Sequence, residues 1–384
     1  MSADSLEVCV SRGSESDFAS EFDSELDSFL DTCPESFAQQ TPSWRDVITR
    51  VEKDEAIFLT CRRAGRLVGL LPTYRFVGPK GSILTSVPLP GPLGGIATRA
   101  GEDRAPIFAA LLDRCLQLAV SLECDLVTVI TNPFRPDAEL YSQVKTPDFI
   151  LDNALQALNL TEDVALDGTL LKASSSLLRN LRRARASGLV VDDAQTLANV
   201  EEWYAIHERR HRQLGATPLP RELFHAALEH AVPSGRARFF FIRRGPGGEM
   251  AAGGLYLCHG SVVDAFMPSM DDRHANERPN HLLAAHSIAG ARSAGYRFYN
   301  WQGSPPEGGV ERFKRSWGSR RFEYCFLTWI TGDTTAFLDA TVNQLIEEYR
   351  WHYVLPFDRL GGAKGAPTDH SQRSDTWKLQ EQAK

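Results

Sequence analysis

The chain has 384 residues, of which 42% are hydrophobic and 24% are charged, and it carries a formal net charge of −7. This balance is typical of a globular protein with room for two or three domains, and the negative charge argues against general binding to DNA. No stretch reaches the roughly 18 uninterrupted apolar residues of a membrane helix, and the start MSADSLEVCV lacks the basic and apolar regions of a signal peptide. We therefore expect a cytoplasmic protein without a transmembrane segment.

Hydrophobic periodicity, capping residues and turn residues predict regular elements along the first half. In chain order these are a strand, two helices, a hairpin that turns at Ala64-Gly65, a third strand, a long helix and a further strand, over residues 6–10, 22–33, 42–52, 56–77, 82–90, 104–124 and 125–131. Between them, Gly91, Gly94 and Gly95 predict a tight loop.

The second half follows a similar plan. It is predicted to contain a helix, a strand, two helices, three strands in a meander, a helix, a strand, a short helix, a strand and a final helix, over residues 174–188, 189–195, 197–215, 220–232, 236–244, 249–259, 262–269, 280–295, 296–301, 308–318, 322–330 and 334–354. The shared order predicts two tandem copies of one fold. We place the domains at 1–170 and 171–360, followed by a polar, disordered tail at 361–384.

The chain resembles the GNAT acyltransferase fold in the order of its elements. This order is helices, a three-strand meander, a helix and a strand. The resemblance implies an α/β protein with mixed, mostly antiparallel sheets flanked by helices. A doubly wound nucleotide-binding fold is the alternative, but it needs regular strand–helix alternation and a Gly-rich turn after its first strand.

Four stretches resemble the FemAB/FemX family of double-GNAT enzymes and its acetyltransferase-like relatives. The most specific is RPNHLLAAHSIAGARSAGYRFYNWQGSPPEGGVERFKRSWG, with a Pro-Asn helix start and a Phe-Lys-x-x-Trp-Gly signature. The others are SFAQQTPSWRDV, TSVPLPGPLGGIA and SSSLLRNLRRARASGL. The second domain is then expected to carry the catalytic groove, with substrate bound near the domain junction.

The resemblance implies that Lys314 projects toward the acyl-transfer centre and that Phe313 packs beneath it. A cationic donor there would stabilise the negative charge that forms on the carbonyl oxygen when an amine attacks. By the same resemblance, Trp44 belongs to a substrate-binding motif. Arg273, Arg278 and Asn280 stand where GNAT enzymes hold a cofactor phosphate, although the usual Gly-rich loop is missing.

Other candidates come from the residues themselves, each with an ordinary alternative. Asp264 could act as general base or mark the polar side of a strand. Arg212 could contact an acidic substrate or complement a helix C-terminus. Trp301, Gln302 and Ser304, at a strand end, could contact substrate or serve packing. The exposed arginines near the start of the second domain could bind an anion or form a solvated helix face: Arg179, Arg182, Arg183 and Arg185.

Cysteine and histidine spacing predicts no metal site. The seven cysteines include no Cys-x-x-Cys pair, and His281 and His286 lie five residues apart, which does not place them on one helix face.

The resulting hypothesis is an acyltransferase that moves an acyl or aminoacyl group onto an amine of an envelope or polysaccharide precursor. Its co-substrate would be acyl-CoA or aminoacyl-tRNA, with no tightly bound cofactor. Three alternatives stay open: an acetyl-CoA-dependent N-acetyltransferase for a small amine, a non-catalytic GNAT binding module, and a tRNA-dependent peptidoglycan bridge ligase. Transfer would be direct, because no nucleophile elbow or Ser-His-Asp order is present. The sequence gives no oligomeric state.

Overall fold

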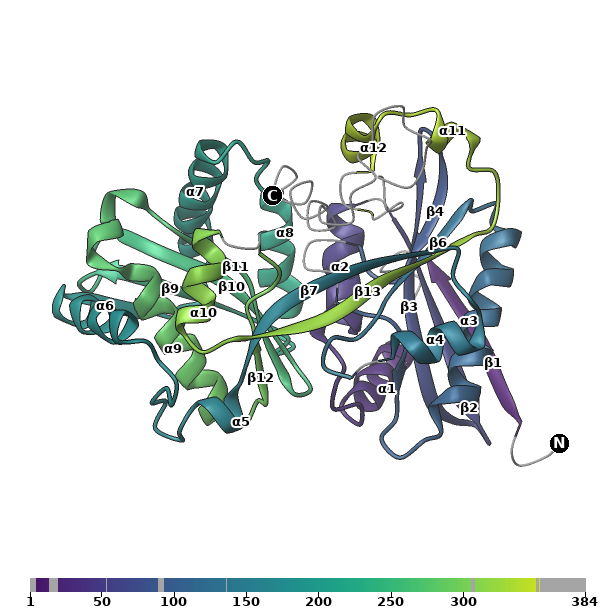
Figure 1. Cartoon of the computed structure of the whole chain (residues 1–384), viewed down its shortest axis with the longest axis horizontal. Helices are drawn as coiled ribbons and strands as arrows, with labels where there is room; N and C mark the ends of the chain where they lie inside the picture. Colours follow the sequence, from purple (N-terminus) through teal and green to yellow (C-terminus); the bar gives the residue numbers. More distant parts are fainter. Residues whose placement is uncertain are drawn as a thin grey trace. The chain divides into compact units, whose positions relative to one another are not determined.

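The computed structural model describes residues 5–13, 20–52, 54–88, 93–135, 137–304, 308–349 and 352. They form two compact units (Figure 1): one contains the described residues up to Ala154 and those of 323–352, and the other contains those of Leu155–Phe322. The tail predicted at 361–384 lies outside the described residues. No helix among those described is long and apolar enough to cross a membrane.

The first unit is an α/β unit built around one sheet. Its elements are β1 Leu6–Gly13, α1 Ser20–Leu30, the 3-10 helix η2 Ala38–Gln40, α2 Pro42–Val51, β2 Glu55–Arg63, β3 Arg66–Gly78, β4 Gly81–Thr85, β5 Ala97–Thr98, α3 Arg104–Ser121, β6 Leu126–Ile130, α4 Ala138–Val144, α11 Thr335–Leu338 and α12 Val342–Glu348. The strand β13, Arg320–Ile330, completes its sheet. The helix starts follow capping chemistry: the Thr41 side chain accepts from the Trp44 amide, and Asp103 accepts from Ala105.

The second unit repeats this plan. Its elements are β7 Phe149–Asn159, α5 Leu160–Asp163, α6 Ser175–Ala186, β8 Leu189–Asp192, α7 Leu197–Gln213, α8 Arg221–Ala226, the π-helix η3 Ala227–Ala231, β9 Ala237–Arg244, β10 Met250–His259, β11 Val262–Met270, the 3-10 helix η4 Asp272–Glu277, α9 Pro279–Ser293, β12 Phe298–Asn300 and α10 Gly309–Ser316. The expected three-strand meander is confirmed, because β10 pairs antiparallel with both β9 and β11.

The two units have equivalent strand orders. The first runs β1-β2-β3-β4-β6-β13, and the second runs β8-β9-β10-β11-β12-β7. In each unit, four antiparallel strands are followed by one parallel pair (β4 with β6, β11 with β12) and then by an antiparallel last strand. The predicted repeat therefore exists at the level of topology.

The last strand in the order of each unit comes from the other repeat. β7 follows the first repeat in the chain, yet its Ala157–Asn159 segment pairs with β12 of the second unit. β13 follows β12, yet its Phe326–Ile330 segment pairs with β6 of the first unit. The compact units therefore differ from the expected division into 1–170 and 171–360, because β13 and the helices after it pack with the first unit.

Each unit has its own hydrophobic core. In the first, α3 and α4 cover one face of the sheet, and Phe108, Leu111 and Tyr141 pack against strand residues such as Val127. In the second, α6 and α9 cover the face that carries Ile242, Tyr256 and Tyr299. Its α7 and α8 lie on the opposite face, where Trp203 packs against Phe239 and Phe224.

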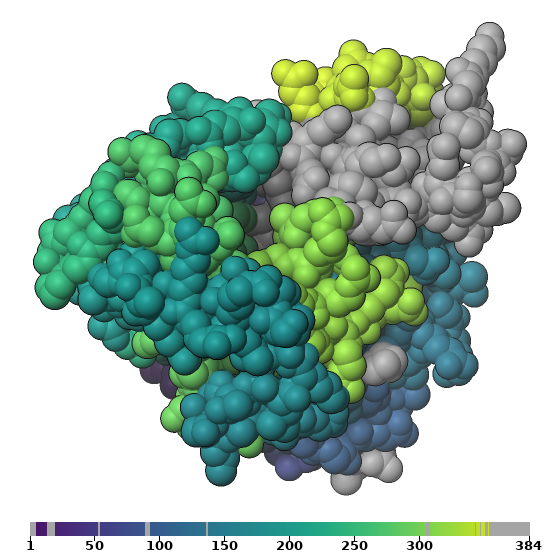
Figure 2. Space-filling view, turned by 60° about the vertical axis from the view of Figure 1, so that its left-hand side comes forward, coloured from purple at the N-terminus to yellow at the C-terminus, as the bar shows by residue number. Residues whose placement is uncertain are grey.

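Packing in the second unit joins segments distant in the sequence. Leu177 and Leu181 of α6 share a core with Leu283 and Ile288 of α9, about 100 residues later. Figure 2 shows the same relation on the surface, where teal atoms from near residues 150–200 lie beside green atoms from near residues 250–300.

Two predictions about elements were wrong or incomplete. The single helix expected at 334–354 is instead two short helices, because Thr341 starts α12 with a capping box in which its side chain and that of Gln344 bond each other's backbone amides. Residues 350–351 and 353–354 of that stretch lie outside the described part. The strand β7 was not predicted, since the segment FILDNALQALN lacks strict apolar alternation.

Candidate active site

The central strands of the second unit form a fork. β11 and β12 pair in parallel only over Val262–Asp264 and Phe298–Asn300. β12 ends there, while β11 continues to Met270 with β10 on its other edge. In the part of the chain that the structure describes, no strand pairs with the freed edge of β11 beyond Asp264. A strand edge without a neighbouring strand can hydrogen-bond an extended amide-containing ligand.

A buried carboxylate marks the apex of this fork. Asp264, 2% exposed, accepts hydrogen bonds from the side-chain amides of Asn300 (3.2 Å) and Gln302. The Gln302 amide contacts both carboxylate oxygens. Since strand neighbours point to opposite faces, Asp264 and Asn300 face away from the core that contains Val263 and Tyr299. That Asp264 acts as a general base stays a prediction. Its hydrogen bonds show that the carboxylate holds the side chains of Asn300 and Gln302 in position.

The backbone of Gln302 is held in an unusual conformation. Its φ is 65°, the left-handed region that residues other than glycine rarely adopt. The side chain is bonded to Asp264, and the amide nitrogen donates to Asn300 Oδ1 at 2.8 Å. Strain of this kind, of order 1–3 kcal/mol, persists where surrounding contacts enforce it. Asp264 and Asn300 are the contacts that do so here.

Lys314 reaches the same turn from α10. The side chain is 6% exposed, and its Nζ donates to the carbonyl oxygens of Gln302 (3.0 Å) and Gly303 (2.7 Å). Lys314 is therefore not a solvated helix lysine, unlike Arg315, which is 64% exposed and pairs with Glu311. A buried ammonium that is bonded to carbonyl groups is a fixed positive charge at the fork.

Aromatic side chains support α10 on the other side. The Phe313 ring meets those of Trp301, Trp317 and His281 at centroid distances of 5.8, 5.9 and 5.1 Å, all in tilted or edge-on geometry. Burial, with a smaller effect of Arg278, lowers the pKa of His281 to about 4, so this ring is neutral at pH 7. Phe313 and Trp301 thus lie together, and packing accounts for both.

Several buried polar atoms around this cluster have no hydrogen-bond partner within the described residues. They are Trp301 Nε1, Trp317 Nε1, Ser304 Oγ, Asn280 Oδ1 and Gln156 Oε1. Buried polar atoms in native proteins are nearly always paired with protein, water or ligand. Their concentration beside the fork is what a site that binds a polar molecule would leave in its unliganded form.

The helix α9 begins just after β11 and η4, at the open end of the fork. Its N-cap residue is Arg278, with φ 65°, followed by Pro279 at the first helical position. Arg278 thus has a left-handed conformation, which glycine adopts more easily than other residues. Arg278 and Asn280 lie at the positive end of the helix dipole, where an anion is favoured. Arg273 differs, since Asp271 and Glu249 already bind its guanidinium.

Two predicted substrate residues lie apart from this cluster. Arg212, in the last turn of α7, pairs with Glu208 at 2.8 Å and is 69% exposed. It belongs to the helix layer opposite α9. Trp44 is in α2 of the first unit and only 1% exposed, so its surroundings give it a packing role. Substrate contact by either residue remains a prediction.

One contributor was not among the sequence candidates. Gln156, on β7, donates its side-chain amide to Glu311 of α10 at 3.3 Å, and its main chain bonds Trp301 and Gln302. No sequence signal could have identified Gln156, because β7 belongs to the other repeat in the chain. Gln302 was named with Trp301 and Ser304 as a possible substrate contact at the strand end, but its bond to Asp264 could not be foreseen.

The equivalent place in the first unit is filled by the chain itself. Beyond the β4–β6 pair, the Ser86 amide donates to Thr128, and the Ser86 hydroxyl accepts from the Ile130 amide at 3.1 Å. Gly95 then packs so closely that a Cβ there would lie 2.4 Å from the Ile130 oxygen. The open fork of the second unit therefore has no open counterpart at this place.

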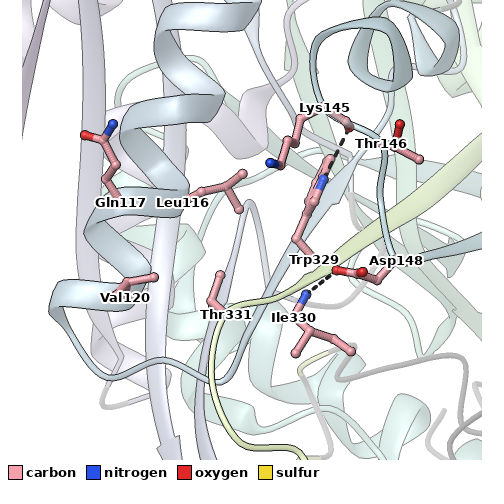
Figure 3. A pocket seen from close by; sticks show the side chains of 9 residues that line it. All are labelled: Leu116, Gln117, Val120, Lys145, Thr146, Asp148, Trp329, Ile330 and Thr331. Atoms are coloured by element: carbon pink, nitrogen blue, oxygen red, sulfur yellow. Dashed lines mark hydrogen bonds between the residues drawn. The ribbon is translucent and has the colours of Figure 1, made fainter.

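The first unit carries a separate shallow groove of about 700 Å³ (Figure 3). It is lined by Leu116, Gln117 and Val120 of α3, by Lys145, Thr146 and Asp148, and by Trp329, Ile330 and Thr331. Its polar groups serve the fold: Trp329 Nε1 donates to the Lys145 oxygen, and Asp148 accepts from the Ile330 amide. None of the predicted site residues lines it.

One cluster consists of residue types that can bind a metal ion, but its carboxylates already form ion pairs with arginines. Single atoms of Glu249, Asp271 and His274 lie within 4.8 Å of one another. Arg209 and Arg273 both bind Asp271, and Arg273 also binds Glu249. These guanidinium groups supply the positive charge that a cation would otherwise bring.

Comparison with known proteins bears on the fold. Residues 172–315 match the family model described as "Acetyltransferase (GNAT) domain". The fold is similar to that of FemX, with a TM-score of 0.65, 14% identity, and coverage of 79% of this chain and 96% of FemX. A search of curated protein sequences gave no match.

Two further solved structures share the fold. One is a tandem GNAT protein from the clavulanic acid biosynthesis pathway (TM-score 0.51, 12% identity, covering 85% of this chain and 99% of that one). The other is the C-terminal domain of a putative lysylphosphatidylglycerol synthetase from Agrobacterium fabrum (TM-score 0.55, 11% identity, 84% and 96%). The expected double-GNAT fold and the resemblance to FemX are confirmed, and both support the expectation of an acyltransferase.

Proposed function

We propose that this protein, which has the FemX-like double-GNAT fold, is an N-acyltransferase whose reaction takes place at the fork of the second unit. It would move an acyl or aminoacyl group onto an amine of an envelope or polysaccharide precursor. The observation that carries the proposal is the convergence of Asp264, Gln302 and Lys314 where β11 and β12 separate.

The geometry supports direct transfer. The freed edge of β11 would bind the extended part of the donor, and the amine would attack the donor carbonyl near the apex. Negative charge that develops on the carbonyl oxygen would be stabilised by the fixed positive charge of Lys314. The new C–N bond forms, the bond to the donor's sulfur or oxygen breaks, and the proton that the amine loses ends on the departing thiol or hydroxyl group.

Acyl-CoA and aminoacyl-tRNA both remain donors in this proposal. An acetyl-CoA-dependent N-acetyltransferase acting on a small amine is the second candidate, favoured by one observation. Arg278 and Asn280 lie at the N-terminus of α9, where a cofactor phosphate would meet backbone amides and a positive helix end. The strict tRNA-dependent bridge ligase is less favoured, because α7 and α8 with η3 form no long helical arm.

The test is binding followed by turnover with the purified full chain. Acetyl-CoA, a longer acyl-CoA and an aminoacyl-tRNA are titrated by calorimetry, and acylated products of candidate amines are detected by mass spectrometry. Binding of one donor with product formation that Lys314→Met abolishes supports the proposal. Binding without any product supports the alternative of a non-catalytic binding module. Failure of all three donors to bind contradicts the proposed acyl transfer.

A further inference from the structure

The helix α6 presents an arginine surface to solvent. Its four arginines, Arg179, Arg182, Arg183 and Arg185, are all exposed. Ala184 is buried, and Leu177 and Leu181 are buried in a core with residues of α9 and of the strands. At about 100° per residue, the four arginines fall within an arc of roughly 160° opposite the buried stripe. We call this arc, together with Leu178 inside it, the α6 surface.

The charge of this surface is not neutralised by the described residues. None of the four arginines forms an ion pair with a described carboxylate, and Arg182 Nε donates only to the Leu178 oxygen at 3.4 Å. Several other arginines of the unit do have carboxylate partners: Arg243 binds both Asp192 and Glu202, and Arg238 binds Asp193. In a chain of net charge −7, a concentrated positive surface of this kind indicates an anionic partner.

Leu178 distinguishes between the classes of partner. Its side chain is 46% exposed, and on the helix it falls between Arg182 and Arg185. Contacts to a nucleic-acid backbone come from cationic and polar side chains and give an apolar one no role. At the surface of an anionic bilayer, guanidinium groups bind phosphates while a leucine enters the apolar boundary beneath the headgroups.

We propose that the α6 surface docks the protein on an anionic phospholipid membrane. The arginines bind the phosphodiester headgroups, and Leu178 inserts among them. This inference is independent of the proposed acyl transfer, because it rests on the charge and exposure of a different element and is measured without turnover.

The experiment is co-sedimentation of the full chain with vesicles of phosphatidylcholine, with and without 30 mol% phosphatidylglycerol. Each basic residue near an acidic membrane typically strengthens binding about fivefold. Arg182→Gln/Arg183→Gln should therefore weaken binding to the anionic vesicles by about 25-fold, and Leu178→Ser should weaken it by a smaller factor. Binding should fall as salt rises from 50 to 500 mM.

The matched control is Arg221→Gln/Arg238→Gln, which removes the same charge from two exposed arginines that have carboxylate partners. It should bind within twofold of wild type, and unchanged melting temperatures confirm that all variants are folded. The proposal is overturned if wild type does not prefer anionic vesicles or if the control weakens binding as much as the α6 variant. It is also overturned if an RNA duplex binds through the same arginines while the vesicles do not.

Discussion

The ammonium of Lys314 lies 2.7 Å from the carbonyl oxygen of Gly303, which joins the helix α10 to the turn that follows β12. The same nitrogen donates to the Gln302 carbonyl, and the Gln302 side chain is bonded to Asp264. The cation proposed for catalysis is therefore held by a turn that a carboxylate on a neighbouring strand keeps in place. The proposed catalytic charge and the local architecture therefore depend on the same residues, Lys314, Gln302 and Asp264.

Lys314→Met is expected to lower the rate of the chemical step by about 10²–10³, because it removes a positive charge aimed at the developing oxyanion and keeps the aliphatic stem. It should also lower the melting temperature by a few degrees, since two carbonyl groups lose their donor. Arg315→Gln is the control, as Arg315 is exposed and bonds only Glu311 among the described residues. Unchanged turnover in Lys314→Met would show that Lys314 has only a structural role.

Asp264→Asn is expected to destabilise the turn by about 1–3 kcal/mol, because an amide would face the donating amide of Gln302. The double variant Asp264→Asn/Gln302→Glu restores one carboxylate and one amide, so stability and turnover should partly recover. A double-mutant cycle in urea and in steady-state assays measures this coupling. If Asp264 is instead the general base, the double variant stays inactive and the acid limb of the pH–rate profile is lost.

Gly95→Ala is expected to cost at least about 3 kcal/mol of unfolding free energy. The residue has φ +86°, and a Cβ would lie 2.4 Å from the Ile130 oxygen and 2.9 Å from the Tyr141 hydroxyl. Gly101→Ala is the matched control, with φ +83° and no atom within 4 Å, and should cost only about 1 kcal/mol. Equal losses in chemical denaturation would show that backbone conformation alone, and not the close approach, determines the effect.

The unfolding free energy should decrease as the pH is lowered, and His207 should cause part of this decrease. Its ring is fully buried, accepts from the Leu219 amide and contacts Ser269, and burial with a smaller effect of His211 lowers its pKa to about 2. The unfolded chain binds a proton on this residue below about pH 6.5, while the folded chain does not until about pH 2. The stability that this residue contributes is therefore fully present above pH 6.5 and is lost progressively as pH falls.

The expected loss from this one residue is about 2–3 kcal/mol between pH 6.5 and 4.5. Urea denaturation at several pH values should show a flatter pH dependence for His207→Gln, which cannot titrate, than for wild type. Parallel pH curves for the two proteins would contradict the prediction.

The sequence by itself determined most of the elements and several residues of the candidate site. Capping residues such as Ser174 and Thr41, and the periodicity of α3, α6 and α9, act within a few residues, so local pattern revealed them. The turn after β12 and the Phe313-Lys314 pair were also found there, since the residues of a short helix and its neighbouring strand end are close in sequence. The loop at Gly95 was predicted for the same reason.

The tertiary structure decided what depends on long-range pairing. The exchange of β7 and β13 between the units joins residues about 140 to 200 positions apart, so no local pattern could place Gln156 beside Glu311 or move the boundary of the units. The bond of Asp264 to Gln302 likewise requires that two strands become parallel neighbours. Burial settled the rest: it separated Lys314 from the exposed Arg315 and left Trp44 inside a core, because exposure is a property of the packed fold and not of the residue type.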